Sequence, residues 1–261
     1  MEYTFISGAT GGIGKAFVFA CAKRGESLYL TGRNIDRLKA LKDEVESEFG
    51  VEVHAFACDL TVLEDRKSML DDIDTKHLKF KKIINVAGVD IQKPFLDYTE
   101  EKLLFQLRVN CEATVHLTYC LAKRLAENAG ILTVSSMSGQ SPMPYFALYS
   151  ASKAMLTNFF TAFHYEMKTK GVKVTTVLPG GVYTRPDIIE DIKGQGVWGK
   201  LSAKSPEFVA EKSLKALSKN KIKYIPGGFN RFLNFIMKLA PKRIVLSFIA
   251  RRWKKQTKDA F

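Results

Sequence analysis

A tyrosine and a lysine stand four residues apart in this sequence, Tyr149 and Lys153, and a serine, Ser136, lies thirteen residues before the tyrosine. If the stretch is helical, the phenol and the ammonium project from one face, one turn apart. A phenol titrates near pH ~10, and a neighbouring ammonium favours the phenolate and lowers that pKa. A serine hydroxyl arriving from a strand can hydrogen-bond a carbonyl or alcohol oxygen. Together the three side chains predict an acid/base device that interconverts an alcohol and a ketone.

Tyrosine and lysine at this spacing also occur on solvated helix faces, so the elements that would position them must decide. Residues 2–7 indicate a short buried strand, which Gly8, Gly12 and Gly14 follow, and an apolar helical run begins at residue 15. A strand, a glycine turn and a helix start bring bare N–H groups and a helix dipole to a phosphate. Glycine also lets the backbone approach a pyrophosphate closely. The turn therefore predicts a dinucleotide site.

The end of the second predicted strand, residues 27–31, carries Arg33. A dinucleotide-binding fold reads the adenosine ribose at this point, with an acid for the 2′-hydroxyl of NAD or an arginine for the 2′-phosphate of NADP. No acidic residue lies between Ser27 and Ile35. The sequence therefore favours NADP(H), and the alternative is that Arg33 is a solvated loop residue.

Predicted strands and helices alternate over some 180 residues. This pattern is typical of an α/β fold with a Rossmann-like doubly wound parallel sheet between two helical layers, in which ligands bind beyond the carboxyl ends of the strands. We expect strands at 2–7, 27–31, 52–57, 82–86, 131–135 and 172–178, and helices at 35–49, 99–128 and 149–170. Chemistry-bearing residues follow those strand ends, namely Gly8, Arg33, Asp59, Asn85, Ser136 and Pro179.

Composition and charge restrict the class of protein further. The chain has 261 residues, of which 46% are hydrophobic, and a net charge of +13. From residue 221 onward there are eleven lysines and arginines against one acid, so +10 of that charge lies in the last 41 residues. Four scattered cysteines and no export signal predict a cytoplasmic protein. The four histidines fit no ligand spacing, so no metal is expected, and residues 71–74 (Asp-Asp-Ile-Asp) are expected to form a solvated loop.

Residues 229–261 are expected to form a basic, amphipathic helical extension. Two apolar runs, 229–239 and 244–249, flank Pro241 and lie among lysines and arginines. Both are shorter than the ~20 residues that a membrane-spanning helix needs. Basic residues beside Phe, Leu and Trp253 suit a helix lying in a membrane interface, so residues 229–258 predict attachment to an anionic membrane surface. The alternative is packing on the body or on a second subunit; nucleic acid is not expected, because no binding motif accompanies the charge.

These motifs, in this order, resemble those of the short-chain dehydrogenase/reductase family over roughly residues 3–217. The resemblance implies that Tyr149 exchanges the proton, Lys153 lowers its pKa and holds the nicotinamide ribose, Ser136 orients the substrate oxygen and Asn110 supports a proton-relay water. It also implies a dimer or a tetramer. Two departures are Val86, where the family more often has a second asparagine, and Ser7 in place of threonine. The implied cofactor residues are Gly8, Thr10, Gly12, Ile13, Gly14, Arg33, Asp59, Leu60, Asn85, Ala87, Gly88, Tyr149, Lys153, Pro179, Gly180, Val182 and Thr184.

The segment after Gly180 is irregular, and glycines surround Trp198. By resemblance, residues near 182–204 form a lid over the substrate. A helix is expected to begin after Ser205, its N-cap. Apolar candidates suggest a hydrophobic ligand such as a sterol, a bile acid or an acyl chain; the alternative is that several only pack the lid. The substrate candidates are Ser136, Met137, Met143, Tyr145, Phe146, Val182, Tyr183 and Trp198.

The sequence therefore predicts one NADP-binding domain, residues 1–228, with a helical extension, residues 229–261. The leading interpretation is an NADP(H)-dependent oxidoreductase that interconverts a secondary alcohol and a ketone on a hydroxysteroid or bile acid. A 3-oxoacyl reductase of lipid metabolism is the alternative within that class. An interpretation of another class is a non-catalytic NADP-binding scaffold or sensor at a membrane, against which the intact set of Ser136, Tyr149 and Lys153 argues.

Overall fold

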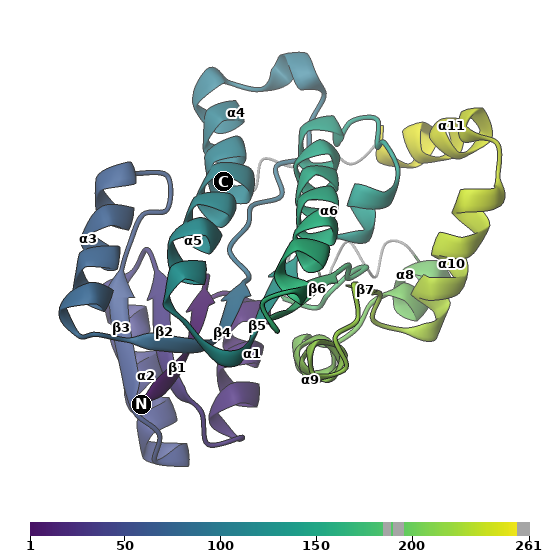
Figure 1. The fold of residues 1–261 in the computed structure, drawn as a ribbon. Helices are drawn as coiled ribbons and strands as arrows, with labels where there is room; N and C mark the ends of the chain where they lie inside the picture. Colours follow the sequence, from purple (N-terminus) through teal and green to yellow (C-terminus); the bar gives the residue numbers. More distant parts are fainter. Residues whose placement is uncertain (185–188, 190–195, 255–261) are drawn as a thin grey trace.

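The computed structural model describes residues 1–184, 189 and 196–254. Its centre is a seven-stranded parallel sheet in the order β3-β2-β1-β4-β5-β6-β7 (Figure 1). This confirms the predicted Rossmann-like fold. The strands are β1 (Glu2–Ser7), β2 (Ser27–Gly32), β3 (Val53–Ala57), β4 (Lys79–Asn85), β5 (Leu125–Val134), β6 (Lys173–Val177) and β7 (Lys223–Tyr224).

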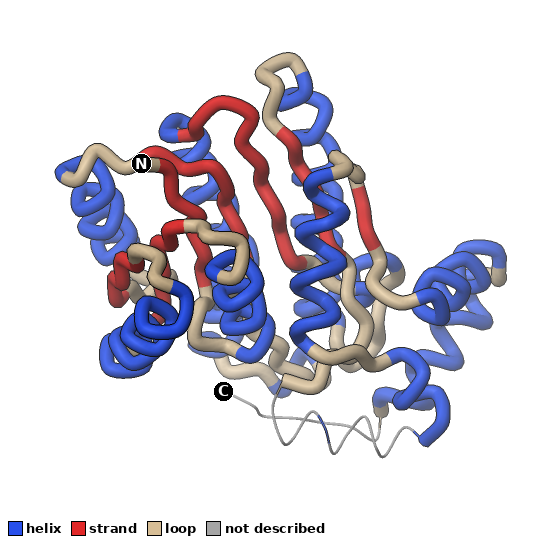
Figure 2. The backbone as a smooth tube through the Cα atoms, turned by 90° about the horizontal axis from the view of Figure 1, so that it is seen from below, coloured by secondary structure: helices blue, strands red, loops and turns tan. Residues whose placement is uncertain are grey.

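Helices cover both faces of the sheet, which Figure 2 shows from below. Successive residues of a strand point to opposite faces, so β1 sends Ile6 into one core and Phe5 into the other. One layer consists of α1 (Gly12–Ala22), α2 (Ile35–Phe49) and α9 (Pro206–Ser218). The other consists of α3 (Leu63–Thr75), α5 (Thr114–Leu121) and α6 (Ala147–Lys168).

The crossover before β5 differs from the single helix expected over residues 99–128. It is built from α4 (Glu100–Leu107), a π-helical segment η2 (Arg108–Ala113), α5 and a short 3₁₀ turn η3 (Ala122–Arg124). Residues 125–128 belong to β5, because Leu125 pairs with Phe80 across a register shift that ends where Gly130 pairs with Lys82. The helical periodicity of a short stretch of sequence gives no information about pairing with a strand far away in the chain.

The acidic stretch 71–74 lies within α3, so its prediction as a loop was wrong. Asp72 accepts a hydrogen bond of 2.9 Å from the Tyr29 hydroxyl, and Asp74 pairs with Arg124. These partners come from other elements and hold the end of α3 in place.

The C-terminal part begins with α8 (Gly196–Ser202) and α9 and continues in two short helices beyond the edge strand β7. These are α10 (Gly228–Leu239) and α11 (Lys242–Trp253). Within the described ranges no helix is long and apolar enough to cross a membrane.

Candidate active site

Ser136, Tyr149 and Lys153 meet where β5 ends and α6 begins. The Ser136 hydroxyl accepts a hydrogen bond of 3.1 Å from the Ser138 N–H in the short turn η4 (Met137–Gln140). Lys153 is buried, and its Nζ donates to the Val134 carbonyl at 3.1 Å and lies 5.7 Å from the centre of the Tyr149 ring. A Cβ on Gly139 would come within 2.6 Å of the Lys153 backbone, so only glycine lets η4 pack this closely on α6. The strand end and the helix are thus fixed to each other.

The protonation of this pair differs from the expectation that the ammonium lowers the pKa of the phenol. Burial raises the pKa of Tyr149 well above its ordinary value, the Asp90 carboxylate raises it further, and a hydrogen bond with Ser136 lowers it. Burial lowers the pKa of Lys153 to about 8, with Asp90 acting in the opposite direction. In both groups desolvation is the largest contribution to the shift in pKa. At neutral pH Tyr149 is therefore a protonated acid, which suits proton donation to a ketone.

Asn110 lies in the π-helical segment η2 and is completely buried. Its Oδ1 accepts from the Val89 N–H at 2.8 Å, and its Nδ2 donates to the Val89 carbonyl at 2.9 Å and to the Ser152 hydroxyl at 3.0 Å. The amide thus joins the segment after β4 to the helix of Tyr149. π-Helical turns are frequent at functional sites. Here the turn places a positioning residue between two parts of the site.

Asp90 is a site residue that was not predicted from the sequence. It is half-buried, and its charge acts on both Tyr149 and Lys153. The signal was present in the sequence: a carboxylate interrupts the apolar segment Val89-Asp90-Ile91, two residues after Gly88 in the segment that follows β4.

The glycine turn between β1 and α1 forms a cradle with no room for side chains. Gly8 has φ +65°, and a Cβ there would lie 2.9 Å from the backbone of Ala87. A Cβ on Gly14 would lie 2.0 Å from the Gly8 carbonyl oxygen, and one on Gly12 would lie 2.8 Å from Thr184 Cβ. The Ser7 hydroxyl accepts from the Ala87 N–H at 3.3 Å and so keeps the two strand ends together. Such a backbone surface at a helix N-terminus fits the pyrophosphate of a dinucleotide.

Two further predicted cofactor residues follow β2 and β3, whose carboxyl ends lie at the same edge of the parallel sheet as that of β1. Arg33 is exposed at the end of β2, with its guanidinium 5.7 Å from the centre of the Phe105 ring. Asp59 follows β3 and accepts hydrogen bonds from the N–H and the hydroxyl of Thr61 at 2.9 and 2.8 Å. Both positions fit the adenosine half of a dinucleotide.

The remaining predicted cofactor residues divide into those at the cradle and those committed to the protein interior. Asn85 belongs to the second group, because its Nδ2 donates to the hydroxyls of Thr118 and Thr133 at 3.0 and 3.1 Å. Gly88 belongs to neither group and lies beside the catalytic pair, since a Cβ there would lie 3.0 Å from Lys153 Nζ. Leu60 and Val182 are buried. Thr10, Ile13, Pro179 and Gly180 lie in the segments that follow β1 and β6.

The substrate side of Tyr149 is apolar and includes the C-terminal helix. Phe146 stacks on Tyr149 with ring centres 4.4 Å apart, and Trp253 of α11 stacks on Phe146 at 5.6 Å. Met143 and Ile249 are buried in the same cluster. Met143 and Phe146 were predicted from the sequence, but their contact with α11 was not, because an apolar pattern does not specify its partner.

For the other predicted substrate residues, the structure gives the element that carries each of them. Met137 lies in η4 beside Ser136, and Tyr145 precedes α6 with a left-handed φ of 64°. The Tyr183 N–H donates to the Lys204 carbonyl at 3.2 Å, which joins the two ends of the predicted lid. Trp198 falls in α8, and residues 185–188 and 190–195 of the lid lie outside the described residues.

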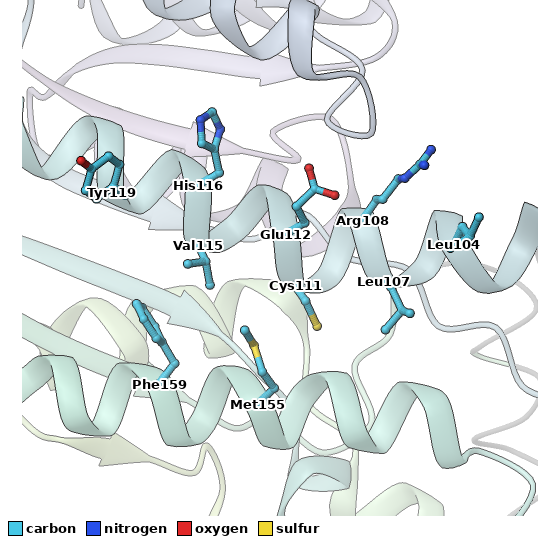
Figure 3. A pocket seen from close by; sticks show the side chains of 10 residues that line it. All are labelled: Leu104, Leu107, Arg108, Cys111, Glu112, Val115, His116, Tyr119, Met155 and Phe159. Atoms are coloured by element: carbon cyan, nitrogen blue, oxygen red, sulfur yellow. The ribbon is translucent and has the colours of Figure 1, made fainter.

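A groove lined mostly by apolar side chains lies on the other side of α6 (Figure 3). Its volume is about 770 Å³, and Leu107, Cys111 and Val115 point toward Met155 and Phe159 across it. Cys111 is half-buried and lines this groove, and burial raises the pKa of its thiol. Met155 is half a turn of the helix away from Lys153, so the groove is separate from the catalytic face.

Assembly into a dimer or a tetramer stays a prediction.

The fold, the cradle and the acid/base group define an NAD(P)-binding oxidoreductase. The short chain dehydrogenase profile matches residues 2–189, and the chain belongs to the short-chain dehydrogenase/reductase family, whose members act on CH–OH donors with NAD(P). No metal-binding group of three or more candidate ligands occurs among the described residues.

Two curated relatives are very-long-chain 3-oxoacyl-CoA reductases. The one from Bos taurus is 31% identical over 83% of this chain and 68% of its own length. The one from Rattus norvegicus is 32% identical over 70% of this chain and 60% of its own length. The chain thus spans about two thirds of the length of these relatives.

Two solved structures share the fold. A 7β-hydroxysteroid dehydrogenase superposes with a TM-score of 0.83 at 24% identity, over 95% of this chain and 96% of its own. A short-chain dehydrogenase from Sphingobium yanoikuyae, in complex with NADPH, gives a TM-score of 0.75 at 24% identity over the full length of both chains.

Proposed function

We propose that this protein is an NADPH-dependent reductase of lipophilic 3-oxoacyl ketones. The observation that carries the proposal is the contact of Tyr149 with an apolar cluster, since a long acyl chain needs an apolar wall beside the acid that protonates its ketone. The curated relatives are reductases of very-long-chain 3-oxoacyl thioesters, and this supports the acyl substrate over the sterol that the sequence first suggested.

In the proposed reaction the Tyr149 phenol donates its proton to the ketone oxygen, and the ketone becomes a secondary alcohol. The Ser136 hydroxyl is close to the phenol and orients the same oxygen. A bound reduced nicotinamide supplies the hydride that the carbonyl carbon receives. Lys153 lies between Gly88 and Val134, where its ammonium would bind a ribose hydroxyl of the cofactor and would stabilise the negative charge left on the Tyr149 oxygen after proton transfer. The geometry of Lys153 is maintained by Asn110 through Ser152.

A screen of NADPH oxidation tests the proposal. The substrates are 3-oxoacyl thioesters of increasing chain length, together with steroid and bile-acid ketones. We expect kcat/KM to increase with acyl length, because each methylene buried against the apolar cluster is worth about 0.8 kcal/mol. A preference for the steroid ketones would support the second candidate, a hydroxysteroid dehydrogenase, which the similar 7β-hydroxysteroid dehydrogenase structure suggests. No turnover with any ketone, despite NADPH binding, would support the non-catalytic scaffold.

The preference for NADP(H) is part of this proposal and rests on Arg33. It is exposed at the end of β2, and no acid stands there to repel a 2′-phosphate. The Sphingobium yanoikuyae structure contains NADPH, which supports the same choice. Replacing Arg33→Ala is expected to raise the KM for NADPH by about 10- to 100-fold, because one charge-assisted hydrogen bond to a phosphate is lost. The KM for NADH is the control and should change little; equal changes for both cofactors would contradict the assignment.

A further inference from the structure

The last two helices, α10 and α11, form a hairpin that stands at the edge of the molecule beyond β7 (Figure 1). The base of α10 is fixed by Asn230, whose side chain is 1% exposed and whose Nδ2 donates to the Ser202 and Pro226 carbonyls at 2.8 and 2.9 Å. The α11 helix returns to the body, where Ile249 is buried and Trp253 stacks on Phe146. The hairpin therefore has a definite inner face and a definite outer face.

Each of the two helices carries large apolar side chains that are exposed. On α10, Phe232 is 61% exposed, Phe235 59% and Leu239 68%. These residues are three to four positions apart, so they form one stripe along the helix. On α11, Ile244 and Phe248 are 64% and 66% exposed and also lie one turn apart. Large apolar side chains gathered in this way mark an interaction surface.

The neighbouring stripe of α10 is basic and lines a groove of about 890 Å³ between α9, β7 and α10. Partial burial lowers the pKa of Lys223, and the positive charge of nearby Lys238 lowers it further. Among the described residues that line this groove none is acidic. The seven cationic side chains are Lys212, Lys215, Lys219, Lys221, Lys223, Arg231 and Lys238.

We propose that the α10–α11 hairpin docks on the surface of an anionic lipid bilayer. The apolar stripes enter the interface between headgroups and acyl chains, and the basic groove binds the headgroup phosphates. Charge complementarity favours this occupant, because a second copy of the chain in a two-fold pairing would bring the same seven cations against the same groove. The binding does not depend on the enzymatic proposal. Delivery of a lipophilic ketone past α11 to Tyr149 is a consequence that does rest on the proposed function.

Co-sedimentation of the full chain with vesicles tests the proposal. Phosphatidylcholine vesicles are compared with vesicles in which phosphatidylglycerol replaces part of the phosphatidylcholine. We expect at least about tenfold stronger partitioning onto the anionic vesicles, decreasing as salt is added, since several basic side chains contribute near a charged surface. The double variant Phe232→Ser/Phe235→Ser is expected to lose roughly tenfold or more of the partitioning, because two large apolar side chains no longer enter the interface.

The matched control is Tyr119→Ser/Tyr165→Ser, since these aromatic side chains are 63% and 60% exposed on other helices. It should partition like the wild type. NADPH oxidation with a short, water-soluble ketone is measured for every variant without vesicles, so that a failure of the enzymatic proposal is seen separately. Equal partitioning onto neutral and anionic vesicles would overturn the proposal. The proposal would also be overturned if the chain did not bind vesicles and formed a dimer that dissociates only in the Phe232→Ser/Phe235→Ser variant. The apolar side chains would then lie in a contact with a second copy of the chain.

Discussion

The two halves of the site are built by different kinds of structure. The cofactor side is made of backbone: Gly8, Gly12 and Gly14 are packed so closely that a Cβ at each would lie within 3 Å of another atom. The substrate side is made of side chains, in which Phe146 and Met143 of the body meet Ile249 and Trp253 of the C-terminal helix. The first half tolerates almost no change, whereas the second can exchange one apolar side chain for another. A fold of this kind can therefore keep its cofactor while its substrate varies.

The largest effect is expected where the two halves meet, at Tyr149. The change Tyr149→Phe removes the proton donor but keeps the ring that stacks on Phe146 at 4.4 Å. We expect kcat for ketone reduction to fall by about 10²- to 10⁴-fold, the range for loss of a general acid. NADPH affinity, measured by fluorescence titration, should stay nearly unchanged. Retained turnover would refute the assignment of Tyr149 as the proton donor.

The second prediction measures how rigid the cofactor side is. In Gly8→Ala the new Cβ meets the backbone of Ala87 at 2.9 Å while the residue keeps a left-handed φ of +65°. We expect the free energy of unfolding to fall by roughly 2–5 kcal/mol, from about 1–2 for the backbone strain and about 1–3 for overpacking. Urea denaturation measures this loss, and NADPH titration measures the accompanying loss of affinity.

The control for this prediction is Gly50→Ala. Gly50 has nearly the same φ, +64°, but a Cβ added there would meet no other atom within 4 Å. Only the strain of about 1–2 kcal/mol remains at this position. Equal losses in the two variants would mean that the cradle is not sterically restricted, and the contrast between the two halves would fail.

These contrasts also explain which features the sequence could predict. The glycine turn was predictable because its chemistry lies in the backbone and its spacing is local. The parallel, doubly wound architecture was predictable from the alternation of strands and helices, whereas the short edge strand β7 was not expected. The π-helical turn was not predictable, because it depends on Asn110 contacting Val89 and Ser152, which lie 21 and 42 residues away. Nor did the sequence reveal that α11 returns to Phe146, since apolar spacing predicts a buried face but not what covers it.

The direction of the Tyr149 pKa was also beyond the sequence. A lysine one turn away suggested a lowered value, and the structure gives a raised one. The reason is desolvation, which depends on how much of the chain surrounds the two groups. That quantity arises only from the packing of β5, α6 and the segment after β4.

A smaller effect is expected on the substrate side. Trp253→Ala removes the outer ring of the stack with Phe146, whose centres are 5.6 Å apart. An aromatic pair is worth about 0.5–1.5 kcal/mol, so the KM for a long-chain ketone should rise by about 2- to 12-fold. The kcat for a short ketone should not change. Phe248→Ala, on the same helix but 66% exposed, is the control and should leave both values unchanged without vesicles. An effect of Phe248→Ala as large as that of Trp253→Ala would mean that α11 acts through its folding and not through this contact.

The smallest effect concerns Asp90, whose negative charge acts on both Tyr149 and Lys153. Its carboxylate raises the pKa of Tyr149 and that of Lys153, which is about 8. Reduction requires the protonated forms, so the rate falls as the pH rises through these pKa values. The change Asp90→Asn removes the negative charge, lowers both pKa values and should move the alkaline limb of kcat/KM to lower pH by about one unit or less. The control is Asp97→Asn in the turn η1 (Phe95–Asp97), an exposed acid that is not among the groups acting on Tyr149 or Lys153. A limb that moves to higher pH in Asp90→Asn, or moves equally in both variants, would show that Asp90 does not set the proton affinity of the acid.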